Sequence, residues 1–179
     1  ESGGQVGDSG TLTGQEDGQV IRILDTQKEN KLHIAICDAM PNNPNQVFLA
    51  KVDATRRQAI SCNHSATHLL HSALREVLGD HVAQKGSLVN QKQLRFDFSH
   101  FAKLSDEELQ RIEARVNQQI QAGLALEELR DMPIEEAKQM GATALFGEKY
   151  GDSVRVIVFD RQYSIELCGG THVPNSRDI

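Results

Sequence analysis

The stretch Asp53–Gly79, DATRRQAISCNHSATHLLHSALREVLG, predicts the element around which this chain folds. Asp53 is a residue type that caps helix N-termini, and Gly79 is one that ends helices. We therefore predict a long helix here, interrupted at most near Cys62-Asn63, where the asparagine side chain competes for backbone hydrogen bonds. Apolar side chains recur along it at helical spacing, as at Ile60, Leu69 and Leu74.

Residues 1–52, before this helix, are rich in glycine and in short runs that favour strands. The runs are Val20–Leu24, Leu32–Cys37 and Val47–Val52, with turns predicted at Asn30-Lys31 and within Pro41–Asn45. Short strands at such even spacing predict a small β-barrel-like subdomain. An irregular Gly-rich arm is the alternative.

Residues 53–179 combine the long helix with further strands and helices. The predicted strands are Ser87–Asn90, Leu94–Phe98, Val154–Phe159 and Ser164–Leu167. A capping box at Ser105 and Glu108 predicts a helix that ends near Gly123, and a shorter helix is predicted from Pro133 to Gly141. The apolar stripe of the first of these helices is Leu109, Ile112, Val116 and Ile120.

The predicted fold class is α+β. A small N-terminal β-barrel-like subdomain (residues 1–52) precedes a helix-backed, largely antiparallel sheet domain (residues 53–179).

The composition excludes several classes of protein. With 39% hydrophobic residues the chain of 179 residues is not a disordered protein. The longest apolar stretches, such as Val156–Phe159, are far shorter than the roughly 20 residues that span a bilayer, so we expect no membrane helix. Three scattered cysteines make no disulfide framework, which favours a reducing, cytoplasmic setting.

The net charge bears on nucleic-acid binding, and the first residue bears on whether the chain is part of a longer polypeptide. The net charge of −6 argues against non-specific coating of nucleic acid, although it leaves room for contact with one RNA end. The chain begins with Glu1 rather than Met, so we expect a domain taken from a longer polypeptide.

Two short motifs carry chemistry. In His64-Ser65-Ala66-Thr67-His68 the imidazoles stand at i and i+4, on one face of a helix, and His71 extends that face. Near the C-terminus, Cys168-Gly169-Gly170-Thr171-His172 places a thiol and an imidazole around a glycine turn. Cys and His side chains together suit Zn²⁺. We predict that His64, His68, Cys168 and His172 share one zinc ion.

These motifs also resemble the editing domain of alanyl-tRNA synthetase. The resemblance runs along the whole chain, through Glu1–Asp8, Gly86–Val89, Leu94–Phe98 and Ala144–Tyr150, to Leu167–Val173. In that family the two His and the Cys/His pair hold zinc, which carries over to the same four residues. Gln5, in the Gly-Gly-Gln element, resembles a residue of the editing pocket and is our catalytic candidate.

The resemblance implies hydrolysis of the aminoacyl ester of mischarged tRNA(Ala), namely Ser-tRNA(Ala) and Gly-tRNA(Ala). Thr67 and Thr171 beside the zinc ligands are candidates for substrate contact, and Lys85 and Arg95 for contact with the acceptor end of the tRNA. The aminoacylation domain, which binds ATP, and the C-terminal oligomerisation domain of the synthetase are absent. We therefore expect the fragment not to charge tRNA and to work with the remainder of the synthetase.

Three alternatives remain open from the sequence. The chain could be a free-standing alanyl-type editing protein or the editing domain of a threonyl-tRNA synthetase, although Gly3-Gly4-Gln5 and the Gly-Gly-Thr-His turn are closer to the alanyl type. It could also be a non-catalytic RNA-binding module that zinc stabilises, which would fold with metal but turn over no ester.

Overall fold

The first part of the chain forms one antiparallel sheet. In this computed structural model, which describes residues 4–29, 32–144 and 151–179, the strand order is β3-β2-β1-β4. β3 and β4 are the two edges, so the described strands form an open sheet rather than a closed barrel. The strands are β1 (Gly10–Gly14), β2 (Val20–Glu29), β3 (Leu32–Cys37) and β4 (Phe48–Val52).

The central strand β1 is the element of this sheet that the sequence did not predict. It is short and has a glycine at each end, so its local preference for a strand is weak. It pairs with β2 on one side and with β4 on the other, and this pairing defines it. Along β2, Ile21 and Ile23 are buried while Val20 and Leu24 are exposed, as expected for a sheet with one covered face.

The predicted long helix is confirmed as α1 (Ala54–Leu78). The Asp53 carboxylate accepts a hydrogen bond from the backbone N–H of Arg56 at 3.0 Å, and Gly79 ends the helix at a φ of 112°. The helix runs without interruption through Asn63. The amide of this side chain donates to the backbone oxygen of Asn90 at 2.8 Å, so it does not compete for the helix's own hydrogen bonds.

A hairpin and a second helix cover one side of α1. β5 (Gln84–Val89) pairs with β6 (Leu94–Phe98), and α2 (Asp106–Ala122) follows. The capping box of Ser105 and Glu108 is present as predicted, with Gly123 in the left-handed conformation at the C-terminus. Ile112 is buried against α1, but Leu109 is 48% exposed, so the predicted apolar stripe begins one turn later than expected.

A second sheet covers the other side of α1. Its strand order is β7-β8-β9, formed by β7 (Glu127–Pro133), β8 (Ser153–Asp160) and β9 (Ser164–Leu167). The short helices are α3 (Ile134–Gln139) and the 3₁₀ turn η1 (Ser176–Asp178). Pro133 ends β7, and α3 begins at Ile134, one residue later than predicted. Charged β7 has no strand pattern of its own and was not predicted.

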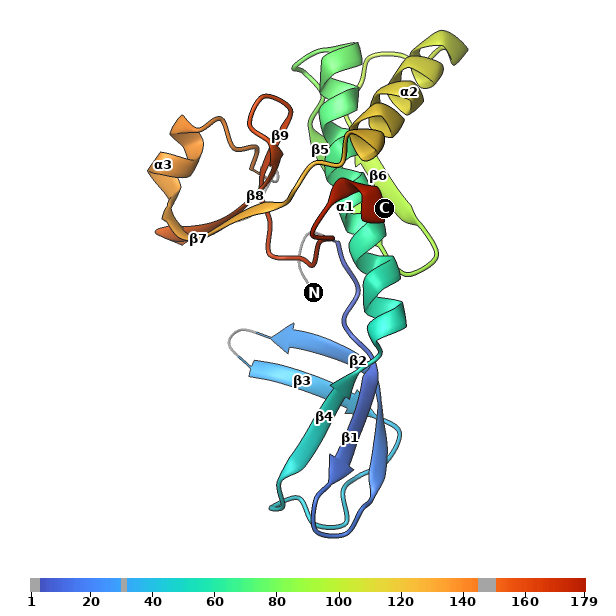
Figure 1. Ribbon diagram of the computed structural model, residues 1–179, viewed down its shortest axis with the longest axis vertical. Coiled ribbons are helices and arrows are strands. Elements are labelled where there is room, and N and C mark those ends of the chain that lie inside the picture. The colour runs from blue at the N-terminus through green and yellow to red at the C-terminus, as the bar shows by residue number, and fades with distance from the viewer. Residues whose placement is uncertain (1–3, 30–31, 145–150) are drawn as a thin grey trace.

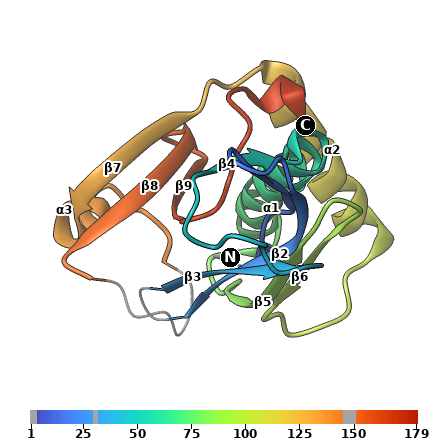
Figure 2. The same ribbon diagram turned by 90° about the horizontal axis from the view of Figure 1, so that it is seen from below.

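The α+β class is confirmed, but the strands after residue 53 form two sheets instead of one. Figure 1 shows α1 running through the molecule with the β1–β4 sheet at its N-terminal end. Figure 2 looks from below and shows β7, β8 and β9 on one side of α1, with β5, β6 and α2 on the other. The long helix therefore packs against β5, β6 and β9, and it follows directly after β4 of the N-terminal sheet.

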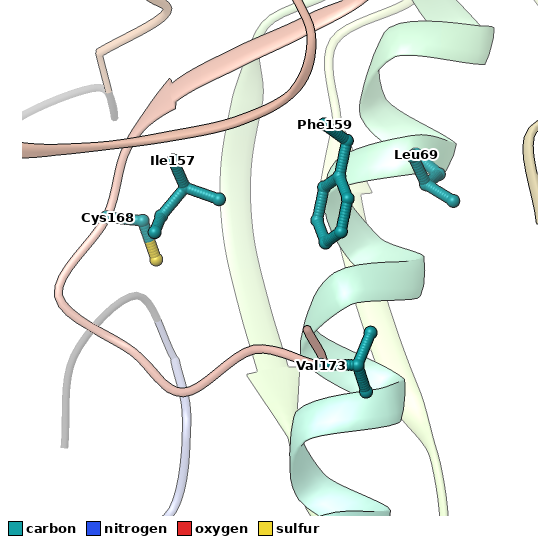
Figure 3. Close-up of a cluster of buried hydrophobic side chains, with 5 residues drawn as sticks. All are labelled: Leu69, Ile157, Phe159, Cys168 and Val173. Atoms are coloured by element: carbon teal, nitrogen blue, oxygen red, sulfur yellow. The ribbon is translucent and has the colours of Figure 1, made fainter. Parts of the chain in front are cut away.

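The core between α1 and the second sheet is drawn in Figure 3, where Phe159 of β8 appears between Leu69 of α1 and Ile157 of β8, all three belonging to one buried cluster. Leu69, Ile157 and Val173 have no exposed surface, and Cys168 lies at the edge of the same cluster. Val173 belongs to the chain that returns from β9 to α1. The apolar contacts that fasten this return are thus adjacent to the predicted zinc ligands.

Some predictions lie outside the described residues. These are the turn at Asn30-Lys31, the start of the chain at Glu1-Ser2-Gly3, and most of the motif Ala144–Tyr150. Across the described part of the chain, none of the helices has the length and apolar character needed to cross a membrane.

The core cluster gives a test of the fold. Replacing Leu69 by alanine should lower the free energy of unfolding by about 2–5 kcal/mol, because it removes a fully buried side chain and leaves a cavity. Leu109→Ala, on the exposed face of α2, is the matched control and should change it by no more than about 0.5 kcal/mol. Urea unfolding at pH 7 measures both. Equal losses in the two variants would contradict the packing described.

Candidate metal centre

α1 presents two buried imidazoles to the second sheet. His64 and His68 are one helical turn apart, and their exposed fractions are 2% and 3%. Their ring centroids lie 5.3 Å apart with the planes nearly perpendicular. The i, i+4 spacing read from the sequence therefore does place both rings on one face, turned into the protein.

The turn after β9 brings Cys168 and His172 to the same place. Gly170 is essential here because a Cβ at this position would overlap the ring of His64 and the Oε1 atom of Gln5. The backbone N–H of Gly170 donates to the Cys168 sulfur at 3.3 Å, which favours the thiolate. The turn is thus pressed against α1 at a position where only glycine fits.

The four side chains converge on one point. Their ligand atoms all lie within 4.8 Å of one another. The Cys168 sulfur is 3.4 Å from Nε2 of His64 and 3.3 Å from Nε2 of His172. Metal–sulfur and metal–nitrogen bonds of zinc-site length imply a tetrahedral edge of about 3.5 Å, so these separations suit a shared cation. The structure brings together the four residues that the sequence predicted, as a group that could hold a metal ion.

Hydrogen bonds determine the tautomer of His64. The backbone N–H of Thr171 donates to Gln5 Oε1 at 2.9 Å, which identifies that atom as the amide oxygen. The same oxygen lies 2.6 Å from Nδ1 of His64, so Nδ1 carries the proton and donates it. Nε2 of His64 then keeps its lone pair, directed at Cys168, as a metal ligand must.

The other two histidines of the centre, His68 and His172, also lie close to polar side chains of the protein. Nδ1 of His172 lies 3.2 Å from the hydroxyl of Ser65, and Nε2 of His68 lies 3.6 Å from a carboxylate oxygen of Glu166. Nδ1 of His68 is buried and has no hydrogen-bond partner among the described residues. An orphaned buried nitrogen beside a thiol and two imidazoles is the donor pattern that a cation would complete.

Burial keeps the imidazoles neutral. It lowers the pKa of His64 to about 4, with the positive charge of Arg155 as a further cause. Burial also holds the pKa values of His68 and His172 well below the usual range for histidine. Neutral imidazole is the form that binds a metal ion.

Arg155 of β8 holds the turn in place, and the sequence analysis missed it. Its Nη1 donates to the backbone oxygens of Cys168 at 2.9 Å and Gly170 at 2.6 Å, while its Nε bonds Glu128 at 2.6 Å. Hydrogen bonds from Arg130 and Arg155 lower the pKa of Glu128 to about 2. The sequence signal was a single arginine within the apolar strand Val154–Phe159, because a charged side chain in a buried strand requires a polar or charged partner.

A cavity of about 560 Å³ adjoins this centre. Gln5 and the turn residues Gly169, Gly170 and Thr171 line it, so the candidate catalytic residue and the candidate substrate contact Thr171 meet at one wall. The Thr171 hydroxyl also contacts Gln5 Oε1 at 3.2 Å and accepts a hydrogen bond from Ser61 at 3.0 Å. Since Oε1 is fully used, the NH₂ of Gln5 is the group left for a ligand.

Three other candidates lie elsewhere. The hydroxyl of Thr67 donates to the backbone oxygen of Asn63 at 2.8 Å, which is a bond within α1. Lys85 lies in β5 and Arg95 in β6, where Arg95 is paired with Asp97 at 3.1 Å. None of the three lines the cavity beside Gln5. Their roles in binding substrate and tRNA stay predictions.

Comparison with known proteins identifies the class. A family model described as the threonyl and alanyl tRNA synthetase second additional domain matches residues 154–179. This segment contains β8, β9 and the Cys168–His172 turn. The segment that carries Cys168 and His172 is therefore similar to a domain of threonyl and alanyl tRNA synthetases.

Matches over the whole chain separate the two types. The chain is 57% identical over 179 residues to an alanine–tRNA ligase of Bacteroides fragilis, 54% over 179 to one of Cytophaga hutchinsonii and 52% over 179 to one of Salinibacter ruber. The alignment covers all of this chain but only 20%, 20% and 18% of those ligases. The chain corresponds to a segment of the alanyl-tRNA synthetase family, about one fifth of the length of these relatives.

The glycine turn gives a test of the centre. Gly170→Ala should weaken cobalt(II) binding at least about tenfold, because the new Cβ displaces the His64 ring from its ligand position. Gly151→Ala is the matched control, since a Cβ there meets, among the described residues, only a backbone oxygen at 4.0 Å. Titration followed by the visible absorption of thiolate-bound cobalt measures both. Unchanged binding in Gly170→Ala would show that the turn does not form the centre.

Proposed function

We propose that this chain hydrolyses the aminoacyl ester of mischarged tRNA(Ala), as the editing part of an alanyl-tRNA synthetase. The observation that carries the proposal is the position of Gln5. Its Oε1 is held by His64 and Thr171, so its NH₂ is left for a ligand at a cavity next to the metal centre. The whole-chain identity to alanine–tRNA ligases supports the alanyl type of substrate.

The need for such a site follows from chemistry. A pocket that accepts the alanyl methyl group also accepts glycine, and it rejects serine by only about 10²-fold because the difference is one hydroxyl. A second site must therefore remove the wrong amino acid. A polar group that recognises the serine hydroxyl achieves this, because alanine offers it no partner.

Gln5 is suited to this recognition. Its amide NH₂ can donate to the serine hydroxyl or to the negative oxygen that develops when water attacks the ester carbonyl. Attack breaks the bond between the carbonyl carbon and the ribose oxygen and releases the free amino acid and the tRNA 3′ end. Hydrogen bonds from Thr171 and His64 fix the amide before substrate arrives, so little freedom is lost on binding.

We propose zinc as the metal of this centre. One thiolate and three neutral imidazoles are ligands that Zn²⁺ prefers, and His64, His68, Cys168 and His172 would hold it. Held by all four side chains, zinc would have the closed shell of a structural site and would join α1 to the C-terminal turn. His64 would link the ion to Gln5 through its two ring nitrogens. Metal binding would therefore help to fix the orientation of the Gln5 amide.

Partners and location follow from the same proposal. The acceptor end of tRNA(Ala) is the substrate-bearing partner, the remainder of the synthetase is the second, and the cytoplasm is the expected location. Threonyl-type editing is the competing function, because the matched family model includes both synthetases.

A deacylation assay tests the function. The chain should release serine from Ser-tRNA(Ala) and leave Ala-tRNA(Ala) intact. Gln5→Ala should reduce the rate at least about 10²-fold, the loss typical when a transition-state donor is removed. Cys168→Ala should reduce it to a similar extent, because it removes a proposed ligand of the metal that orders the site. Cys37→Ala is the matched control, because Cys37, at the end of β3, is neither a member of the metal centre nor a residue that lines the cavity, and it should leave the rate unchanged.

Other results of the deacylation assay would assign a different function or different residues. Faster hydrolysis of Ser-tRNA(Thr) than of Ser-tRNA(Ala) would assign the threonyl type. Metal-dependent folding with no ester turnover would assign the non-catalytic RNA-binding module. Equal rates in Cys168→Ala, Gln5→Ala and the unaltered chain would remove these residues from the site.

Metal removal is a separate test. Dialysis against a chelator should abolish the deacylation of Ser-tRNA(Ala), and added Zn²⁺ should restore it, because the ion orders the four ligands and, through His64, Gln5. Elemental analysis of the purified chain should find one zinc per molecule. Full activity in metal-free protein would contradict the role of the centre.

A further inference from the structure

The cavity beside Gln5 has a second wall that the proposed function does not use. Opposite Gln5 and the Gly169–Thr171 turn, it is lined by the β2–β3 hairpin of the N-terminal sheet. Its volume of about 560 Å³ is within the range of about 300–1,000 Å³ that accommodates a whole small-molecule ligand. An amino-acid side chain fills only a small part of it. Something larger fits between the two walls.

Strand register places two of the hairpin residues that line the cavity side by side. The Thr26 hydroxyl contacts the backbone N–H and oxygen of Asp8, at 2.8 and 3.2 Å, so this face of β2 is turned toward the segment that carries Gln5. Side chains two residues apart share a face, which places Lys28 beside Thr26. His33 pairs with Lys28 across the hairpin. Both Lys28 and His33 line the cavity.

The hairpin wall carries an ammonium group, on Lys28, and an imidazole, on His33. The carboxylate that lines the cavity is that of Asp8, and it is paired with the guanidinium of Arg57. Lys28 and His33 are exposed, and their side chains form no hydrogen bond or ion pair within the described residues. An ammonium group and an imidazole that lie side by side on the wall of a cavity, with no partner among the described residues, suit an anionic ligand.

We propose that Lys28 and His33 bind the phosphodiester backbone of the RNA 3′ end whose terminal aminoacyl-adenosine occupies the cavity. The inference rests on the proposed function, and it makes the substrate an aminoacylated RNA strand rather than a free amino-acid ester. Gln5 and Thr171 contact the amino acid at one wall, and the hairpin holds the strand at the other. The N-terminal sheet is then a part of the RNA-binding surface.

Binding of unacylated tRNA(Ala) tests the contact directly. The double variant Lys28→Ala/His33→Ala should weaken binding at least tenfold at low salt. It should also reduce the slope of log K against log salt by about 0.7 for each lost contact to single-stranded phosphate. Lys51→Ala, on β4 outside this cavity, is the matched control and should match the unaltered chain. Lys28→Glu is a second variant at the same exposed position. It should weaken binding further, because the new carboxylate repels the RNA phosphates.

Deacylation kinetics separate this inference from the proposed function. With Ser-tRNA(Ala), the double variant should raise KM at least tenfold and leave kcat within about twofold, because the reacting groups are untouched. An unaltered KM, affinity and salt slope in the double variant, with hydrolysis by the unaltered chain, would overturn the inference alone. No hydrolysis by the unaltered chain would instead overturn the proposed function.

Discussion

The Oε1 atom of Gln5 joins three parts of the chain that are distant in sequence. It accepts hydrogen bonds from His64 of α1 and from both the backbone N–H and the hydroxyl of Thr171 in the C-terminal turn. Gln5 itself belongs to the segment that leads into the N-terminal sheet. Each of these bonds is ordinary in strength, but together they determine how the sheet, the helix and the turn are placed.

Many buried polar groups surround this atom, and their satisfaction decides whether the site is stable. His64, His68 and Glu166 are almost completely buried, and leaving such groups without partners costs about 1–3 kcal/mol each, and more for a charged group. Most partners come from the protein, as in the contact of Glu166 with His71 at 3.2 Å. Nδ1 of His68 and Nε2 of His71 have no partner among the described residues, and a bound cation is the group that would use the nitrogen of His68.

The glycine turn helps to hold the amide of Gln5 in a fixed position. Arg155 ties two carbonyls of the turn to β8, and the absence of a side chain at Gly170 lets the turn lie against His64. Gln5 is therefore held from two sides while one edge of its amide stays available. A recognition group that is rigid before substrate arrives spends little binding energy on ordering.

Local sequence determined the elements with strong signals of their own. The caps Asp53 and Ser105 with Glu108 and the i, i+4 histidines act within one helix, so the structure has them where the pattern predicts. β1 and β7 were missed because their strand state comes from pairing with neighbours rather than from their own residues. The convergence of His64 and His68 with Cys168 and His172 was expected from motif and family resemblance, because no rule of spacing connects residues a hundred positions apart. Only tertiary packing decided that Arg155 anchors the turn and that the Lys28–His33 pair faces it, since both depend on how separate sheets meet across α1.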